Sequence, residues 1–172
     1  MVKKILLLSL IMVATGLFSQ AKDFTVTGSG VRVKKVAFVS VNVYNITHAM
    51  KDVPAKNAAE IIAADTDKKF TLKLMRDLDA EKIANAIKDA FTANGYTNSA
   101  NINSFSAVLT GDLKENDLIT IAYNSATKAT TCNSGGKTSS INGVDFMKAT
   151  WSIWFGKIDQ PALTQSLMSK IP

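Results

Sequence analysis

The sequence predicts an α+β domain in which an antiparallel sheet is covered by helices. Segments with strand alternation lead the chain, segments with helical spacing follow, and this order then repeats. Such an order differs from the regular strand–helix alternation that builds a parallel sheet. A third observation is the Ser-Gly-Gly signal between residues 128–133 and 137–142, which predicts a hairpin of two antiparallel strands.

The strands are predicted from the alternation of apolar and polar residues. Residues 24–27 alternate, and the glycines within residues 28–30 predict a bend or a bulge after them. We expect one long strand over residues 31–46, whereas a bend at residues 34–35 would instead give two neighbouring strands. Further strands are expected over residues 69–75, 117–123, 128–133 and 137–142.

The helices are predicted from apolar residues at helical spacing and from signals at the helix ends. Residues 55–65 follow Pro54, and proline suits the first turn of a helix. Asp79 can cap a helix that Gly95 ends. A weaker helix is expected over residues 99–109, and the last helices over residues 144–155 and from Pro161 to about Lys170.

Residues 1–21 have the layout of a secretory signal peptide. Lys3 and Lys4 precede an apolar run over residues 5–18, and small residues follow at the expected cleavage point. This run is shorter than the roughly 20 residues that a membrane-spanning helix requires, although a retained membrane anchor is the alternative. We therefore expect export to the periplasm or the medium, one mature domain over residues 22–172, and no stable membrane anchor after cleavage.

The composition argues against several classes of function. The single cysteine, Cys132, has no partner for an internal disulfide and is expected to be a buried packing residue. The single histidine, His48, has no partner at metal-ligand spacing, and no HExxH, GxSxG or phosphate-loop motif is present, so we expect neither a metal nor a cofactor. The net charge of +6 is spread along the chain without a basic run interleaved with aromatic residues, which argues against nucleic acid as a partner.

Arg32 and Tyr44 are the exception to this lack of chemical signatures. They lie twelve positions apart, so they face the same side of one strand, or lie side by side on two strands if the chain bends. An arginine on a half-apolar face is unfavourable unless it meets an anion. Its guanidinium suits a carboxylate, to which a tyrosine hydroxyl can also donate. The alternative is that Arg32 pairs with one of the chain's own acidic residues at the edge of the sheet.

Several segments in order resemble the chalcone isomerase-like family. They are GSGVR at residues 28–32, a strand that ends in VY at 43–44, KFTLKLMRDLDAEKIANAIKDAF at 69–91, and GVDFMKATWSIWFGKIDQPALTQSLMSKIP at 143–172. The resemblance implies an open-faced β-sandwich, in which a large antiparallel sheet is covered by a layer of helices with a ligand cleft between them. The family's enzymes close a chalcone into a flavanone without a cofactor, and Arg32 matches their catalytic arginine.

Other catalytic positions of the family do not match this sequence. Tyr44 stands where the enzymes have a threonine, and Ile153, beside Ser152, stands where they have a second hydroxyl. Tyr96 and Asn103 match a tyrosine and an asparagine of the enzymes only loosely. A tyrosine at position 44 resembles instead the fatty-acid-binding branch of the family, in which an arginine and a tyrosine hold the carboxylate of an acyl chain.

The resemblance therefore implies that Arg32 and Tyr44 form the polar end of an apolar cleft. The other candidate ligand-binding residues and cleft walls are Val36, Phe38, Ile87, Phe91, Tyr96, Trp151 and Trp154. The leading hypothesis is an exported, non-catalytic protein that binds a small amphipathic ligand, a carboxylate such as a fatty acid or a phenolic compound. The alternatives are an isomerase or intramolecular lyase with Arg32 as its catalytic residue, and a structural or interaction protein whose cleft Trp151 and Trp154 fill.

Overall fold

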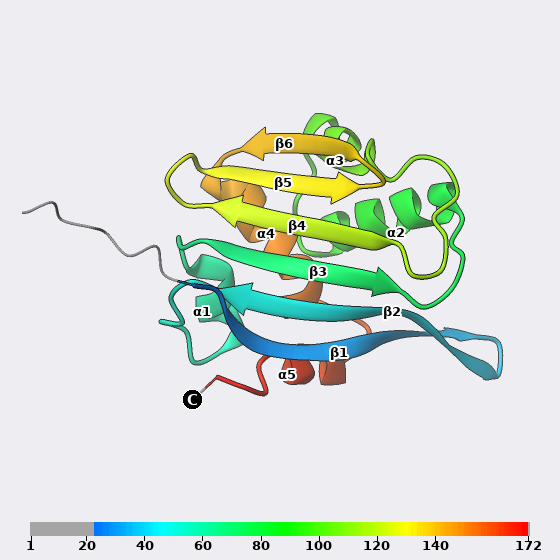
Figure 1. The fold of residues 1–172 in the computed structure, drawn as a ribbon, viewed down its shortest axis with the longest axis horizontal. Coiled ribbons are helices and arrows are strands. Elements are labelled where there is room, and N and C mark those ends of the chain that lie inside the picture. Colours follow the sequence, from blue (N-terminus) through cyan, green and yellow to red (C-terminus); the bar gives the residue numbers. More distant parts are fainter. Residues whose placement is uncertain (1–22, 172) are drawn as a thin grey trace, which may run out of the picture.

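The computed structural model describes residues 23–171, and the expected signal peptide at residues 1–21 lies outside the described residues. Within the described range, no helix combines the length and the apolar character that crossing a bilayer requires. The described chain forms one sheet with helices packed behind one of its faces (Figure 1).

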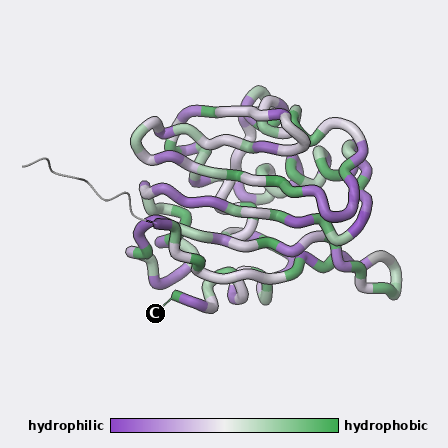
Figure 2. Tube along the Cα trace, in the orientation of Figure 1, coloured by the Kyte–Doolittle hydropathy of each residue, from purple (hydrophilic) through white to green (hydrophobic). Residues whose placement is uncertain are grey.

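Within residues 23–171 the sheet has six strands, each antiparallel to the next, and their order in space follows the chain. Apolar and polar residues follow one another along the strands (Figure 2), as expected when one face of a sheet is covered. The α+β class and the antiparallel sheet under a layer of helices are therefore confirmed. The strands are β1 (Thr25–Val36), β2 (Val39–Met50), β3 (Lys68–Leu74), β4 (Leu118–Asn124), β5 (Ala129–Ser134) and β6 (Lys137–Asn142).

The expected single strand over residues 31–46 is wrong, because a tight turn divides it into parts of β1 and β2. The turn falls at residues 37–38 rather than at 34–35. Ala37 has a φ of 54° there, a conformation in which glycine is the usual residue. No glycine, proline or asparagine marks this turn, so the strand alternation of the sequence runs through it unbroken.

The described residues contain five helices, α1 (Ala58–Ala63), α2 (Ala80–Ala93), α3 (Ser99–Ser106), α4 (Val144–Phe155) and α5 (Pro161–Leu167). The expected cap of α2 is present, since the Asp79 side chain accepts a backbone N–H of the first turn. α1 is shorter than the helix expected over residues 55–65. The reason is that Asn57 caps it, three residues after Pro54.

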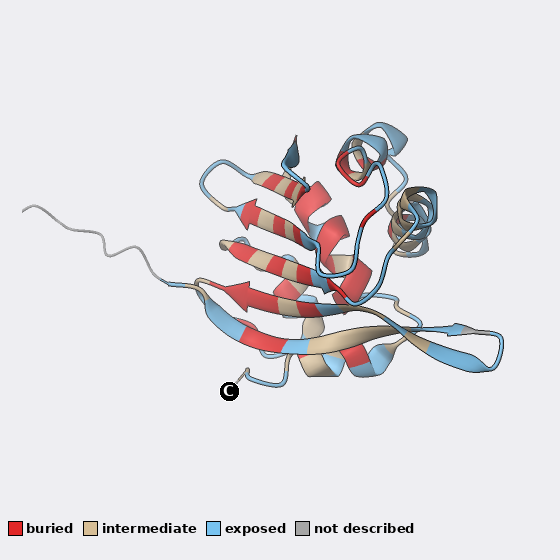
Figure 3. Ribbon diagram, turned by 45° about the vertical axis from the view of Figure 1, so that its right-hand side comes forward, coloured by how far each residue is buried: buried red, intermediate tan, exposed pale blue. Residues whose placement is uncertain are grey.

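α4 lies in the core between the sheet and the other helices (Figure 3). Most of its residues are buried, whereas Asp145 and Lys148, three positions apart, are exposed on one face of the helix. Its neighbours along the chain are the β6 hairpin strand and α5, so it links the sheet to the C-terminal segment. The buried residues of α4 are Phe146, Met147, Ala149, Thr150, Trp151, Ile153, Trp154 and Phe155.

α5 packs directly against β1, and two glycines allow this close approach. A Cβ atom on Gly28 would lie 2.5 Å from the Leu167 carbonyl carbon. A Cβ atom on Gly30 would lie 2.7 Å from Leu163 Cδ1. The Gly-Ser-Gly segment before Arg32 therefore positions α5, and with it the loop between α4 and α5.

The C-terminal segment also hydrogen-bonds to the outer edge of β1. The Lys170 N–H donates to the Thr27 carbonyl oxygen (2.8 Å). The Gln160 side chain accepts from the Val33 N–H (2.9 Å) and donates to the Val31 carbonyl oxygen (2.9 Å). The Gln160 amide thus pairs with β1 as the backbone of a neighbouring strand would.

Candidate ligand-binding cleft

A cleft of about 740 Å³ lies between the covered face of the sheet and α2. This volume falls within the roughly 300–1,000 Å³ that is typical of small-molecule sites. The walls are mostly apolar, with charged side chains among the remaining lining residues. The apolar walls include Val43, Leu72, Leu74, Ile83, Ile87 and Ile153, which come from β2, β3, α2 and α4.

The cleft is open because α2 is anchored at its C-terminal end rather than along its length. Ile83 and Ile87, on its apolar face, are half-buried, whereas Phe91 is fully buried. Asn94 holds this end of the helix, since its side-chain amide donates to the Lys157 carbonyl oxygen (3.2 Å) and its Oδ1 accepts from the Lys157 N–H (2.7 Å). The remaining apolar face of α2 is therefore available to a ligand.

Arg32 and Tyr44 lie side by side in the lining of the cleft. They are direct partners in the β1–β2 pairing, so the alternative of two neighbouring strands holds for this pair. The register shifts after them, because Val33 pairs with Asn42 rather than with Val43. A bulge of this kind re-aims side chains, and here Val43 and Tyr44 both line the cleft although they are adjacent in sequence.

Arg32 is paired with an acidic residue of the chain itself, the second arrangement that the sequence left open. Its Nη1 lies 2.6 Å from Asp159 Oδ1 and 3.4 Å from Gln160 Oε1. The Arg32 side chain is 19% exposed, whereas that of Asp159 is 74% exposed, so the carboxylate stands at the water boundary. A guanidinium has five N–H donors, and those on Nε and Nη2 have no acceptor among the described residues.

The Tyr44 hydroxyl is held in place and keeps its proton for donation. Its oxygen accepts a hydrogen bond from Trp154 Nε1 (3.0 Å). Burial raises the pKa of Tyr44, although the Trp154 hydrogen bond and the Arg32 charge act in the opposite direction. The hydroxyl is therefore neutral at pH 7, and its proton meets no acceptor among the described residues.

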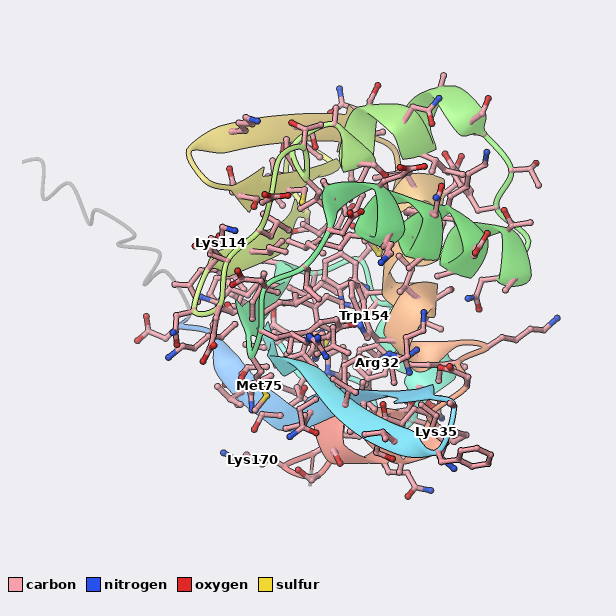
Figure 4. All side chains as sticks on the ribbon, turned by 90° about the vertical axis from the view of Figure 1, so that its right-hand side faces the viewer. Arg32, Lys35, Met75, Lys114, Trp154 and Lys170 are labelled. Atoms are coloured by element: carbon pink, nitrogen blue, oxygen red, sulfur yellow. The ribbon has the colours of Figure 1, made fainter. Side chains whose placement is uncertain are left out.

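The two candidate tryptophans are neighbours on α4, and both rings contact Phe70, but only one of them lines the cleft. Trp154 lines the cleft, beside Arg32 (Figure 4). Trp151 does not line the cleft, because it is buried in the core and donates through Nε1 to Nε2 of the buried His48 (2.9 Å). Its expected place in a cleft wall is therefore corrected: Trp151 belongs to the packed interior.

Phe91 and Tyr96 also lie outside the cleft lining. Both pack in an aromatic cluster, in which the Phe91 and Tyr96 ring centroids are 5.6 Å apart and Phe146 lies 5.6 Å from Phe91. The Tyr96 hydroxyl accepts from Asn101 Nδ2 (2.7 Å). These side chains stabilise the end of α2 and do not face a ligand in the cleft.

Phe38 lies at the tip of the turn between β1 and β2 and is 104% exposed. It is absent from the cleft lining, because the turn at residues 37–38 carries it away from the strand face on which it was expected. The side chain of Val36, the other candidate from this segment, lies outside the described residues.

Asp159 and Gln160 are site residues that sequence reasoning missed. Gln160 lies 128 positions along the chain from Arg32, and its approach depends on the packing of α5 against β1. The one signal available was an acid and an amide directly before Pro161, in a loop whose place the sequence does not show.

Two titratable residues outside the cleft, Cys132 and His48, are buried in the core. Burial raises the pKa of Cys132 to about 12 and lowers the pKa of His48 to about 3, so both are neutral at pH 7. His48 Nδ1 lies 2.6 Å from Thr27 Oγ1. Within residues 23–171, no group of three or more His, Cys, Asp or Glu side chains is arranged to hold a metal ion.

Comparisons with known proteins agree with this fold. The crystal structure of a fatty-acid binding protein from Arabidopsis thaliana matches with a TM-score of 0.68 at 12% sequence identity, over 84% of this chain and 86% of that one. At this identity the likeness establishes the fold. No curated protein sequence matches the chain. The model of the chalcone isomerase-like family matches residues 11–168, and the chain therefore belongs to the chalcone isomerase-like family.

Proposed function

We propose that this protein is an exported, non-catalytic binding protein for a small amphipathic carboxylate such as a fatty acid. The carboxylate meets Arg32 and Tyr44, and the acyl chain lies along the apolar walls of the cleft. One observation carries the proposal: a mostly apolar cleft of about 740 Å³ includes in its lining an arginine with N–H donors that meet no acceptor in the described part of the chain.

The apolar walls and the polar residues of the cleft contribute differently to ligand binding. Each methylene group that leaves water for the apolar walls contributes about 0.8 kcal/mol, so most of the affinity comes from the acyl chain. The free N–H groups of Arg32 suit the two oxygens of a carboxylate, and the Tyr44 hydroxyl adds a donor of its own. These polar contacts set the direction in which the ligand lies.

The competing hypotheses have less support. A cleft filled by its own side chains requires both Trp151 and Trp154 against Arg32 and no remaining cavity. Trp154 lines the cleft, but Trp151 donates to His48 in the core, and a cleft of about 740 Å³ remains. An isomerase of the family's type requires a second hydroxyl near the arginine, and Ile153 in the cleft wall has none. The fatty-acid binding protein with the same fold supports binding rather than turnover.

The proposal is tested by mass spectrometry of small molecules that co-purify with the protein from the periplasm or the medium. The intact mass of that protein is expected to correspond to a chain that starts at Lys22. Arg32→Ala should weaken binding of a fatty acid about 10- to 100-fold, since a hydrogen bond to a charged group contributes about 1.5–3 kcal/mol. Binding of the methyl ester should change far less.

Arg76→Ala is the matched control, because it removes the same charge from another residue of the cleft lining. It should change fatty-acid affinity by less than threefold, as expected for a solvated charge. Equal losses for the acid and the ester in Arg32→Ala would contradict the carboxylate contact. A wild-type protein that stays empty with fatty acids but converts a chalcone, in an Arg32-dependent way, would establish the isomerase instead.

A further inference from the structure

The β1–β2 hairpin extends beyond the rest of the sheet as a two-stranded ribbon (Figure 1). β2 pairs with β3 from Tyr44 onward, whereas residues 39–42 pair with β1 alone. At the tip, residues 37–40 are all exposed (Figure 3). The ribbon therefore projects from the body of the domain, and its tip adds nothing to the core.

The tip of the ribbon is apolar. Phe38 is 104% exposed and Val39 is 63% exposed, so two adjacent large apolar side chains stand in water. Figure 2 shows the tip among the hydrophobic segments of the chain. A contiguous exposed apolar patch is typical of a surface that contacts a protein or a membrane. Within residues 23–171, neither of these two side chains belongs to the packed core.

The ribbon is also cationic. Lys34 and Lys35 are exposed directly before the tip, and the sequence has no acidic residue between Asp23 and Asp52. In Figure 4 Lys35 projects from the hairpin end of the molecule. Two copies of this ribbon would repel each other, so a second copy of the chain is a poor occupant. Exposed cations beside a projecting aromatic ring suit an anionic lipid surface.

We propose that the β1–β2 ribbon docks the protein on an anionic lipid bilayer. Phe38 and Val39 enter the boundary between headgroups and acyl chains, and the ammonium groups of Lys34 and Lys35 meet the lipid phosphates. Lys34 and Val41 also line the cleft, so the ribbon leads from the bilayer surface to the cleft. This docking is a separate property from ligand binding, and it does not depend on which ligand the cleft binds.

The first test measures binding to vesicles of phosphatidylcholine, with and without phosphatidylglycerol. The wild-type protein should bind the anionic vesicles more tightly, and added salt should weaken this binding. Phe38→Ser should lower the partition coefficient by about tenfold or more, because the aromatic transfer is lost. Lys35→Glu should lower it by at least about fivefold.

Lys170→Glu is the matched control, since it makes the same charge change on an exposed residue near the C-terminus, away from Lys35 (Figure 4). It should lower the partition coefficient by less than about twofold. Phe38 and Lys35 do not line the cleft, so their variants should bind fatty acid in solution as the wild type does. Failure of docking and failure of ligand binding are therefore distinguishable.

A second readout reports the ribbon itself, because the apolar N-terminal residues 5–18 would bind vesicles wherever they are retained. In Phe38→Trp, the introduced indole should shift its emission to the blue on anionic vesicles and be quenched by brominated acyl chains. Thr127→Trp, in the exposed turn between β4 and β5, should show neither change. The proposal is overturned if the wild type does not bind anionic vesicles, or if the bound Phe38→Trp protein is not quenched. Binding to an acidic polypeptide but not to vesicles would overturn it in favour of a protein partner.

Discussion

The ion pair between Arg32 and Asp159 determines what a ligand carboxylate has to replace. The hydrogen bond from Arg32 lowers the pKa of Asp159, so the Asp159 carboxylate is ionised at pH 7 and competes for the guanidinium. The exposure of Asp159 limits the strength of this pair, since exposed ion pairs contribute about 0–1 kcal/mol. Arg32 is therefore held in position by a contact that a better-placed carboxylate can displace.

Asp159→Asn should raise the affinity for a fatty acid about three- to tenfold, because it removes the competing negative charge. The stability of the fold should change by less than about 0.5 kcal/mol, as is usual for exposed positions. Titration calorimetry with a soluble medium-chain acid measures the first quantity, and urea unfolding measures the second. Weaker binding in Asp159→Asn would show that Asp159 orients Arg32 rather than competes for it.

At the scale of single residues, the sequence pointed to Arg32 and Tyr44 because the chemistry of an arginine on a half-apolar strand is unusual wherever it occurs. The same reasoning failed for Asp159, because an aspartate in a loop is common and does not by itself indicate a site. It also failed to separate Trp151 from Trp154, because residues three positions apart lie on the same face of a helix.

At the scale of elements, the contact between α5 and β1 depends on two glycines, Gly28 and Gly30. They differ in how easily the neighbouring atoms could make room for a side chain. The nearest atoms to a Cβ on Gly28 belong to the backbone of Ser166 and Leu167, which a helix cannot easily move. The nearest atoms to a Cβ on Gly30 belong to the side chains of Leu163 and Ser166, which can adopt other rotamers. The first glycine is therefore more constrained than the second.

Gly28→Ala should destabilise the protein by about 3 kcal/mol or more, as overpacking against rigid backbone does. Gly30→Ala, which adds the same methyl group two positions away, should cost about 1 kcal/mol. Urea unfolding monitored by tryptophan fluorescence measures both. Equal effects of the two substitutions would mean that α5 shifts as a rigid unit and that the backbone overlap at Gly28 is not decisive.

Elements with a clear period or a clear end signal were predictable, as Asp79 before α2 and the Ser-Gly-Gly hairpin show. The β1–β2 turn was not, because Ala37 adopts its positive φ without the residue types that favour it. That one missed turn also displaced Phe38 from the cleft to the tip of the ribbon. The position of α2 above the cleft depends on tertiary contacts such as Asn94 with Lys157, which no local pattern records.

At the scale of the whole molecule, the buried side chain of His48 makes the stability of the fold depend on pH. Burial, with a smaller effect of the nearby Lys68 charge, lowers the pKa of His48 from 6.5 to about 3. Below pH 6.5 the unfolded chain takes up a proton at this residue, while the folded chain does so only near pH 3. The unfolded state thus binds more protons in this window, so folding stability falls as the pH falls.

The expected slope from His48 is up to about 1.4 kcal/mol per pH unit between pH 6 and pH 4. Urea midpoints at several pH values measure it. His48→Gln should be less stable at pH 7, because hydrogen bonds with Thr27 and Trp151 are altered, but its stability should depend less on pH in this window. An unchanged slope in His48→Gln would assign the acid sensitivity to the carboxylates.

The pairing of Gln160 and Lys170 with β1 has a consequence for the behaviour of the protein at high concentration. An open strand edge is a template on which strands of other molecules can add. Here the C-terminal segment occupies hydrogen-bonding groups along that edge at Thr27, Val31 and Val33. A chain cut before Gln160 would expose this row of groups beside an apolar hairpin tip, and fibre formation would be the first sign of the loss.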